Sequence, residues 1–404
     1  MVAKAFTKLS ASISSIALLA APAAHAQDTA QVEFRAGGIV ASDPFLARSS
    51  DDGASVAAHV EVLPEMIWRD ETTSLRLDGR LRYEEWFDGY DGDLSGEIGV
   101  GVRKKASETL DLFALGAFES IERSSPEVLI GSIQNVDDLP VIDAGLDTLD
   151  PTIGIGGIRR QSALATAGFR KDLSTVSELG VSLSTNINWF DESGVDYRST
   201  ELTANYAQTL APNLALVLEV RGGKADFIDQ SRGDGTFGSA TAGVRTQVSP
   251  TGTLSASAGI ALADVDTGLG SRQRGEFFIA AVDFCEDILQ GKACLSAVRQ
   301  TRPTTIGGAS TLTSVDFGWS RAYERGDRLS LNVRYTDTQA ELAAFDLERV
   351  ADTKFVGATA FYSYPINDRF GLYVSPSVLK LFDNVSDRDT NYQVMFGLSY
   401  TFGR

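Results

Sequence analysis

The chain has 404 residues, of which 38 are glycine and two are cysteine, and 43% are hydrophobic. The 54 acidic side chains outnumber the 36 basic ones and give a net charge of −18, which argues against binding to nucleic acid. Beyond the N-terminus no apolar run approaches the roughly 20 residues of a membrane-spanning helix. This composition favours an all-β protein over a helical enzyme.

Residues 1–26 have the pattern of a secretory signal peptide. Lys4 and Lys8 give a positively charged start, and an apolar stretch follows. Ala24-His25-Ala26 then matches the small-x-small pattern that signal peptidase cleaves after. We therefore expect export, with residues 27–404 forming one domain.

From residue 32 onward, segments of about ten residues alternate between apolar and polar side chains, which is the period of a β-strand. We count about 16 strands, with 14 and 18 as alternatives. The alternation changes phase around Pro376, which predicts a β-bulge or a strand bend there. The pattern is clearest over residues 75–84, 94–102, 110–118, 179–189, 254–262, 329–335 and 392–402.

The breaks between these segments alternate in length. The short set covers residues 69–72, 104–108, 171–175, 208–213, 249–253, 323–328 and 364–369. The longer set covers residues 43–54, 86–93, 119–161, 190–196, 222–235, 264–309, 337–352 and 383–389. A soluble β-sandwich has no reason to sort its loops in this way. We therefore predict a transmembrane antiparallel up-and-down β-barrel in a bacterial outer membrane, with short periplasmic turns and long extracellular loops.

In strand and loop order the chain resembles outer-membrane β-barrels of the porin type, in particular the 16-stranded general porins. Ser42-Asp43-Pro44-Phe45-Leu46 also resembles the putative β-barrel porin families linked to exopolysaccharide loci. The resemblance implies lipid, lipopolysaccharide and the barrel insertion machinery as partners, and a homotrimer as one assembly. Such barrels usually end in an aromatic residue, whereas Gly403 and Arg404 follow Phe402 here.

The same resemblance implies a constriction of the lumen. In general porins the third external loop, here about residues 119–161, folds inward and narrows the channel. Acids on the loop would then face arginines on the wall and create a transverse field for polar solutes. The alternative is an external loop, with the arginines paired to Asp78 and Glu84. The candidate residues are Arg76, Arg80 and Arg82 on the wall and Asp137 and Asp138 on the loop.

Both cysteines, Cys285 and Cys294, lie in the sixth long break. An exported pair is expected to form a disulfide, which a loop this short makes worth just under about 3 kcal/mol. The alternative is two free thiols. Helical spacing in parts of residues 276–299 predicts a short helix-rich cap or plug.

We expect no enzymatic activity, cofactor or metal. His59 is the one histidine after the cleavage site, should face the lumen, and has no nucleophile motif to serve. Asp91-Gly92-Asp93 resembles the start of a calcium loop, but Val102 occupies the position of its closing glutamate. The function we expect is passive passage of small polar solutes. Two alternatives are a role in exopolysaccharide export and a non-conducting structural or adhesion barrel.

Overall fold

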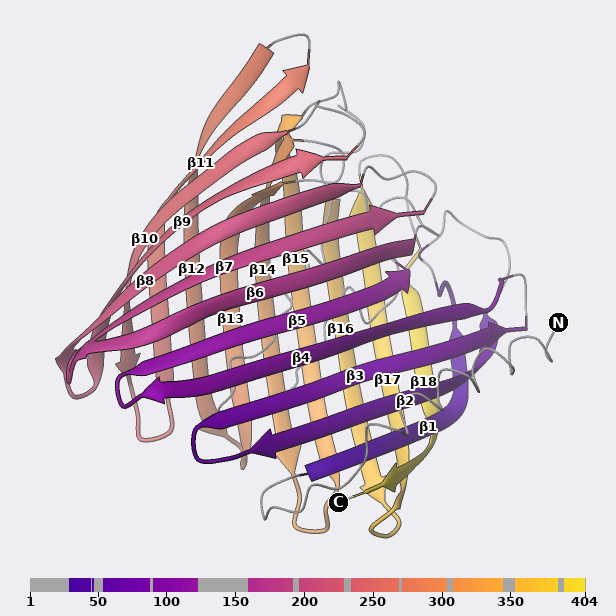
Figure 1. Ribbon diagram of the computed structural model, residues 1–404. Helices are drawn as coiled ribbons and strands as arrows, with labels where there is room; N and C mark the ends of the chain where they lie inside the picture. The colour runs from indigo at the N-terminus through magenta and orange to yellow at the C-terminus, as the bar shows by residue number, and fades with distance from the viewer. Residues whose placement is uncertain are drawn as a thin grey trace.

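The described residues form one closed antiparallel sheet of 18 strands, which is shown in Figure 1. The sheet closes because β1 pairs with β2 on one side and with β18 on the other. The described residues contain no helix that could span a bilayer. This computed structural model describes residues 29–44, 46, 54–87, 90–122, 159–191, 196–228, 234–268, 271–303, 308–343, 353–383 and 389–403.

Each strand pairs with its neighbours in sequence, so the topology is up-and-down and the predicted barrel class is confirmed. The strands are β1 (Thr29–Ala41), β2 (Ser55–Arg69), β3 (Thr73–Trp86), β4 (Asp93–Ser107), β5 (Leu110–Glu122), β6 (Arg159–Ser174), β7 (Ser177–Phe190), β8 (Tyr197–Ala211), β9 (Leu214–Phe227), β10 (Gly235–Gln247), β11 (Thr253–Gly268), β12 (Ser271–Ile288), β13 (Gly291–Pro303), β14 (Gly308–Ala322), β15 (Arg328–Ala343), β16 (Thr353–Pro365), β17 (Phe370–Asp383) and β18 (Asn391–Phe402).

The outer surface of the barrel is apolar. On β18, Val394, Phe396 and Leu398 point outward and are 41–55% exposed, which is unusual for large hydrophobic side chains in a water-soluble fold. Alternate residues of the same strand, such as Asn391 and Gln393, point inward and are buried. The dyad pattern of the sequence therefore places oily groups outside and polar groups inside, as a membrane barrel requires.

The count of 16 strands was wrong, because residues 264–309 are not a loop. They contain the end of β11, all of β12 and β13, and the start of β14. The predicted helix-rich cap over residues 276–299 is wrong for the same reason. β12 and β13 are joined by Leu289 and Gln290, whose φ angles of 55° and 61° form a tight hairpin without the usual Asn-Gly signal.

The predicted bulge at Pro376 is also wrong. β17 keeps one register with β16 on both sides of the proline, from Thr359 opposite Ser377 to Tyr362 opposite Val374. The phase change in the sequence instead marks two inward-facing leucines, Leu379 and Leu381, which are 0% and 2% exposed. They are apolar because they pack inside the barrel, so both faces of this strand segment are hydrophobic.

Candidate functional site

The lumen has an apolar collar at the end of the barrel that carries the longer connections. Its members on strands face inward near the outer ends of those strands, and Leu46 lies in the connection after β1. They form three buried clusters, and we call them together the outer collar: Ile39, Ala41, Ala57 and Trp86; Tyr197, Ala225 and Phe227; and Leu312, Phe355, Leu379 and Leu381 with Leu46. This end of the lumen is therefore lined by hydrophobic side chains.

Below the collar, strands β1 to β6 carry a layer of ion pairs that we call the packed wall. Arg160 Nη2 lies 2.6 Å from Glu119 Oε1, and each side chain is 5% exposed. Arg35 Nη1 lies 3.3 Å from Oε2 of Glu61, whose side chain is 4% exposed. Charged groups that are buried this deeply are stable only when they are paired, so the pairs fix the shape of this side of the lumen.

The three predicted arginines lie on the inner face of β3 within this packed wall. Arg76 pairs with Asp78 at 3.0 Å and with Glu65 at 3.4 Å. Arg80 pairs with Glu97 at 3.4 Å, and Arg82 pairs with Glu84. Wall neighbours thus already pair with all three guanidinium groups.

Asp137 and Asp138 lie outside the described residues. That these two acids face the arginines of β3 across the lumen therefore stays a prediction.

His59 faces the lumen as expected and is 2% exposed. Its Nε2 shares a short hydrogen bond with the hydroxyl of Tyr373, which comes from β17 on the far side of β1 and β18. The guanidinium of Arg35 lies 5.6 Å from the ring centroid of Tyr373 and 5.2 Å from that of Phe361. The sequence could not reveal this group, because His59 and Tyr373 are 314 residues apart and meet only through barrel closure.

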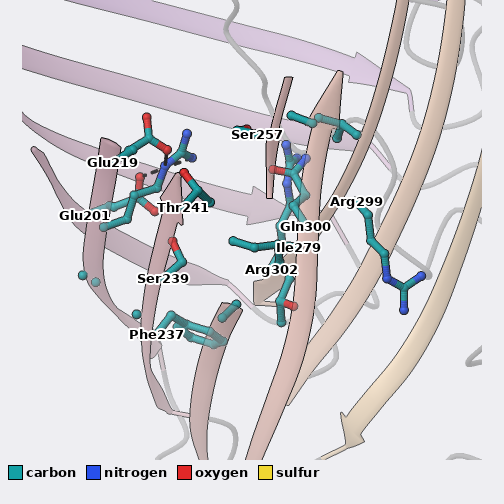
Figure 2. Close-up of a pocket in the computed structure, with 18 of the residues that line it drawn as sticks. Glu201, Glu219, Phe237, Ser239, Thr241, Ser257, Ile279, Arg299, Gln300 and Arg302 are labelled. Carbon is teal, nitrogen blue, oxygen red and sulfur yellow. Dashed lines mark hydrogen bonds and ion pairs between the residues drawn. The ribbon is translucent and has the colours of Figure 1, made fainter. Parts of the chain in front are cut away.

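A cavity of about 490 Å³ opens between β7 and β13, on the side of the lumen that we call the open wall. Figure 2 shows Glu201 and Glu219 beside hydroxyls of Ser239 and Thr241. Arg221 Nε lies 2.7 Å from Glu219 Oε1, and its Nη1 lies 4.0 Å from Glu201 Oε1. The side chains of Arg221 and Glu201 are each 44% exposed, so these charges are available to a solute.

These open-wall residues were not among the predicted site residues. The sequence does contain a pattern that indicates their direction, because Glu219 and Arg221 occupy alternate positions of β9 and Glu201 lies on β8. Alternation places all three on the lumen face. The sequence alone did not show which of the many inward charges stay exposed.

A second cavity of about 400 Å³ lies among the short turns at the opposite end. Its lining includes Asp70, Arg103, Glu108 and Asp172. The backbone N–H groups of Thr72 and Thr73 donate to the Asp70 carboxylate and lower its pKa below the ordinary value. The Asx turn thereby fixes the tight connection between β2 and β3.

Cys285 and Cys294 form the predicted disulfide, with Cα atoms 4.1 Å apart. They are direct cross-strand partners on β12 and β13, and their side chains lie on the inner face. The short Cα distance identifies a pair without mutual backbone hydrogen bonds. The bond therefore lies within the barrel wall and not in a loop.

The described residues hold no group of three or more histidine, cysteine or acidic side chains arranged to bind a metal. In the segment that resembles a calcium loop, Asp93 pairs with Arg159.

The sequence matches no protein-family model and no curated protein. Solved structures with a similar course of the chain include OpdQ of Pseudomonas aeruginosa, at 10% identity and a TM-score of 0.44, covering 94% of this chain and 100% of that one. OccK2 (OpdF) of the same organism, in complex with glucuronate, covers 93% and 98% at 10% identity and a TM-score of 0.47. The siderophore receptor PiuA of Acinetobacter baumannii covers 95% and 82% at 8% identity and a TM-score of 0.49. At these values the chain is not assigned to the family of any of them.

Proposed function

We propose that the protein is an outer-membrane channel for the passive passage of small polar solutes. The observation that carries this proposal is the division between the two faces of one closed barrel. The outside exposes large hydrophobic side chains, whereas the inside holds an accessible cavity lined by charges and hydroxyls. Barrels of 16 to 18 strands are wide enough to leave an aqueous channel.

The open wall supports small polar solutes over apolar ones. Arg221 offers a cation, Glu201 and Glu219 offer carboxylates, and the neighbouring hydroxyls donate and accept hydrogen bonds. A solute with hydroxyl or charged groups can exchange water for these partners at little cost. Because Arg221 pairs with both acids, none of the three charges should trap a solute tightly.

We also propose that the arginine row of β3 forms one side of a constriction, with Asp137 and Asp138 opposite. The test is the double substitution D137N/D138N. A loop that lies in the lumen should change single-channel conductance and ion selectivity when these charges are removed. Unchanged conductance and selectivity would place both acids outside the ion path.

A non-conducting barrel is the alternative that one observation favours. The outer collar packs apolar side chains inside the mouth of the lumen, where they could leave no water-filled path. Tyr197, Ala225 and Phe227 of the collar lie on β8 and β9 of the open wall, so a channel requires a water-filled path between the three collar clusters.

Planar-bilayer recording on the purified, refolded protein separates these possibilities. Folding is checked first by the heat-dependent shift in electrophoretic mobility that membrane barrels show. Steady open steps that scale with salt concentration support the channel. A folded barrel that inserts into the bilayer and gives no steps would refute it.

A further inference from the structure

The barrel wall is incomplete between β12 and β13. Their ladder begins beside the hairpin turn at Ile288 and Gly291, and its last pair is Ala280 with Arg299. The next four positions, residues 276–279 on β12 and residues 300–303 on β13, are extended on both strands but are not paired with each other. Instead, this part of β12 pairs only with β11, and this part of β13 pairs only with β14. We call this gap the seam.

Beyond the seam, β11 and β12 pack against β14 and β15 instead of continuing the ladder between β12 and β13. Ala263 and Val265 of β11 form a buried cluster with Ala309 of β14, and Phe277 and Leu342 pack against it. Five consecutive residues of β14, from Gly308 to Leu312, are buried, which requires cover on both faces of the strand. The outer ends of β11 and β12 therefore lie over β14, and Figure 1 shows them rising at the top of the barrel.

The open-wall cavity reaches the seam. Its lining includes Ile279, Gln300 and Arg302, which alternation places on the lumen side, and Arg299 and Thr301, which it places on the outer side. Figure 2 shows Arg299 pointing away from Gln300 and Arg302. The lumen cavity is thus continuous with groups that face the exterior.

The outer side of the seam combines a cation with an apolar surface. Arg299 Nη1 donates to the hydroxyl of Thr313 at 3.0 Å. Phe278, at the edge of the seam, is 60% exposed, and its cross-strand partner Ile260 is 59% exposed. A guanidinium on a lipid-facing row is costly unless it lies near an anionic group.

We propose that the seam is a lateral opening that binds an amphiphilic anion. Arg299 holds its carboxylate or phosphate, and the alkyl chain lies along Phe278 and Ile260 on the same outer face, in the outer leaflet. This inference rests on the membrane location proposed above but not on conduction along the barrel axis. The Cys285–Cys294 disulfide secures the closed half of the same strand pair and so limits how far the seam extends.

Closing the seam with a second disulfide tests the proposal. Continuing the register of the ladder places Ile279 opposite Gln300, in the same inward-facing class of pair as the native disulfide. The variant is I279C/Q300C, and the matched control is D283C/S296C, which joins residues that are already paired. Peptide mapping confirms which cysteines are joined.

Binding is measured with tetradecanoic acid and with tetradecyl phosphate by equilibrium dialysis against the protein in detergent. A second arm measures binding to phosphatidylcholine vesicles with or without phosphatidic acid. This comparison shows whether the seam binds a free amphiphile or the headgroup of a membrane lipid. We expect oxidised I279C/Q300C to bind at least tenfold more weakly than the native protein, and oxidised D283C/S296C to match the native protein. Equal binding by oxidised I279C/Q300C and the native protein would overturn the proposal.

The charge arm uses R299Q, with R325Q in a periplasmic turn as the control. Affinity should fall about tenfold in R299Q and stay unchanged in R325Q. Undiminished affinity in R299Q would overturn the assigned head site. Bilayer recordings on the same samples measure conduction along the barrel axis separately. A barrel that gives no current steps, but whose affinity for the amphiphile falls when the seam is cross-linked, refutes the channel and supports the seam.

Discussion

The packed wall and the open wall are built from the same dyad pattern but present their charges differently. In the packed wall the side chains of Arg160 and Glu119 are 5% exposed, whereas in the open wall those of Arg221 and Glu201 are 44% exposed. Both sets alternate with lipid-facing apolar residues, so alternation alone sets direction and not accessibility. The comparison teaches that one side of the lumen is a fixed structural layer, whereas the other keeps its paired charges exposed.

Removing one partner of a buried pair should give the largest effect. In R160A the carboxylate of Glu119 loses its cation at a site with little access to water, and we expect a loss of about 3–5 kcal/mol in the free energy of unfolding. R221A, in the open wall, should cost about 0–1 kcal/mol, because water solvates the remaining acids. Urea-induced unfolding in detergent, followed by tryptophan fluorescence, measures both.

The double variant R160M/E119L is the control for this prediction. It removes both charges and should recover most of the stability that R160A loses. Equal losses in R160A and R221A would remove the energetic distinction between the two walls.

The disulfide should have the next largest effect, and it acts on the open wall. C285S/C294S releases a loop with a sequence separation of 9, which the chain-entropy model values at about 2.7 kcal/mol. The same urea experiment measures this loss, and reduction of the native protein should reproduce it. If the native protein tolerates reduction without any shift in midpoint, the bond does not hold β12 and β13 together.

The sequence predicted the barrel class, the direction of inward side chains and the disulfide, because each depends on a local signal. Alternation fixes which face a residue occupies, and exported cysteines pair. It failed at β12 and β13 because Phe277 and Phe278, like Ile279 and Ala280, make both faces of the strand apolar. Inward residues there pack against neighbouring side chains instead of contacting water, so the sequence no longer alternates between apolar and polar residues.

The candidate site was harder to predict than the fold. Arg76, Arg80 and Arg82 were correctly placed on the inner face of β3, but whether an inward charge is buried or exposed depends on strands far away in sequence. The contact between His59 and Tyr373 exists only because β18 closes onto β1.

A smaller effect is expected at the hairpin that the sequence did not signal. Leu289 and Gln290 both have positive φ angles, which cost side-chain-bearing residues roughly 1–2 kcal/mol each. L289N/Q290G supplies residues suited to this turn and should stabilise the protein by about 1 kcal/mol in urea unfolding. A destabilised variant would contradict the tight hairpin and return this segment to a longer loop.

The smallest effect in energy is the most direct test of the open wall as the solute path. A unit charge about 7 Å from an ion in water is worth about 0.6 kcal/mol, which is about threefold in local ion concentration. A carboxylate enriches cations and depletes anions by this factor each, so E201Q and E219Q should each lower the cation-to-anion permeability ratio by about sevenfold at low salt, measured as a shift in reversal potential. The shift should shrink at high salt, because mobile ions screen exposed charges. E61Q, in the packed wall, is the matched control and should leave the ratio unchanged, since its carboxylate is shielded from the lumen. If E61Q shifts the reversal potential while E201Q and E219Q do not, ions pass along the packed wall, and the roles of the two sides of the barrel are the reverse of those assigned.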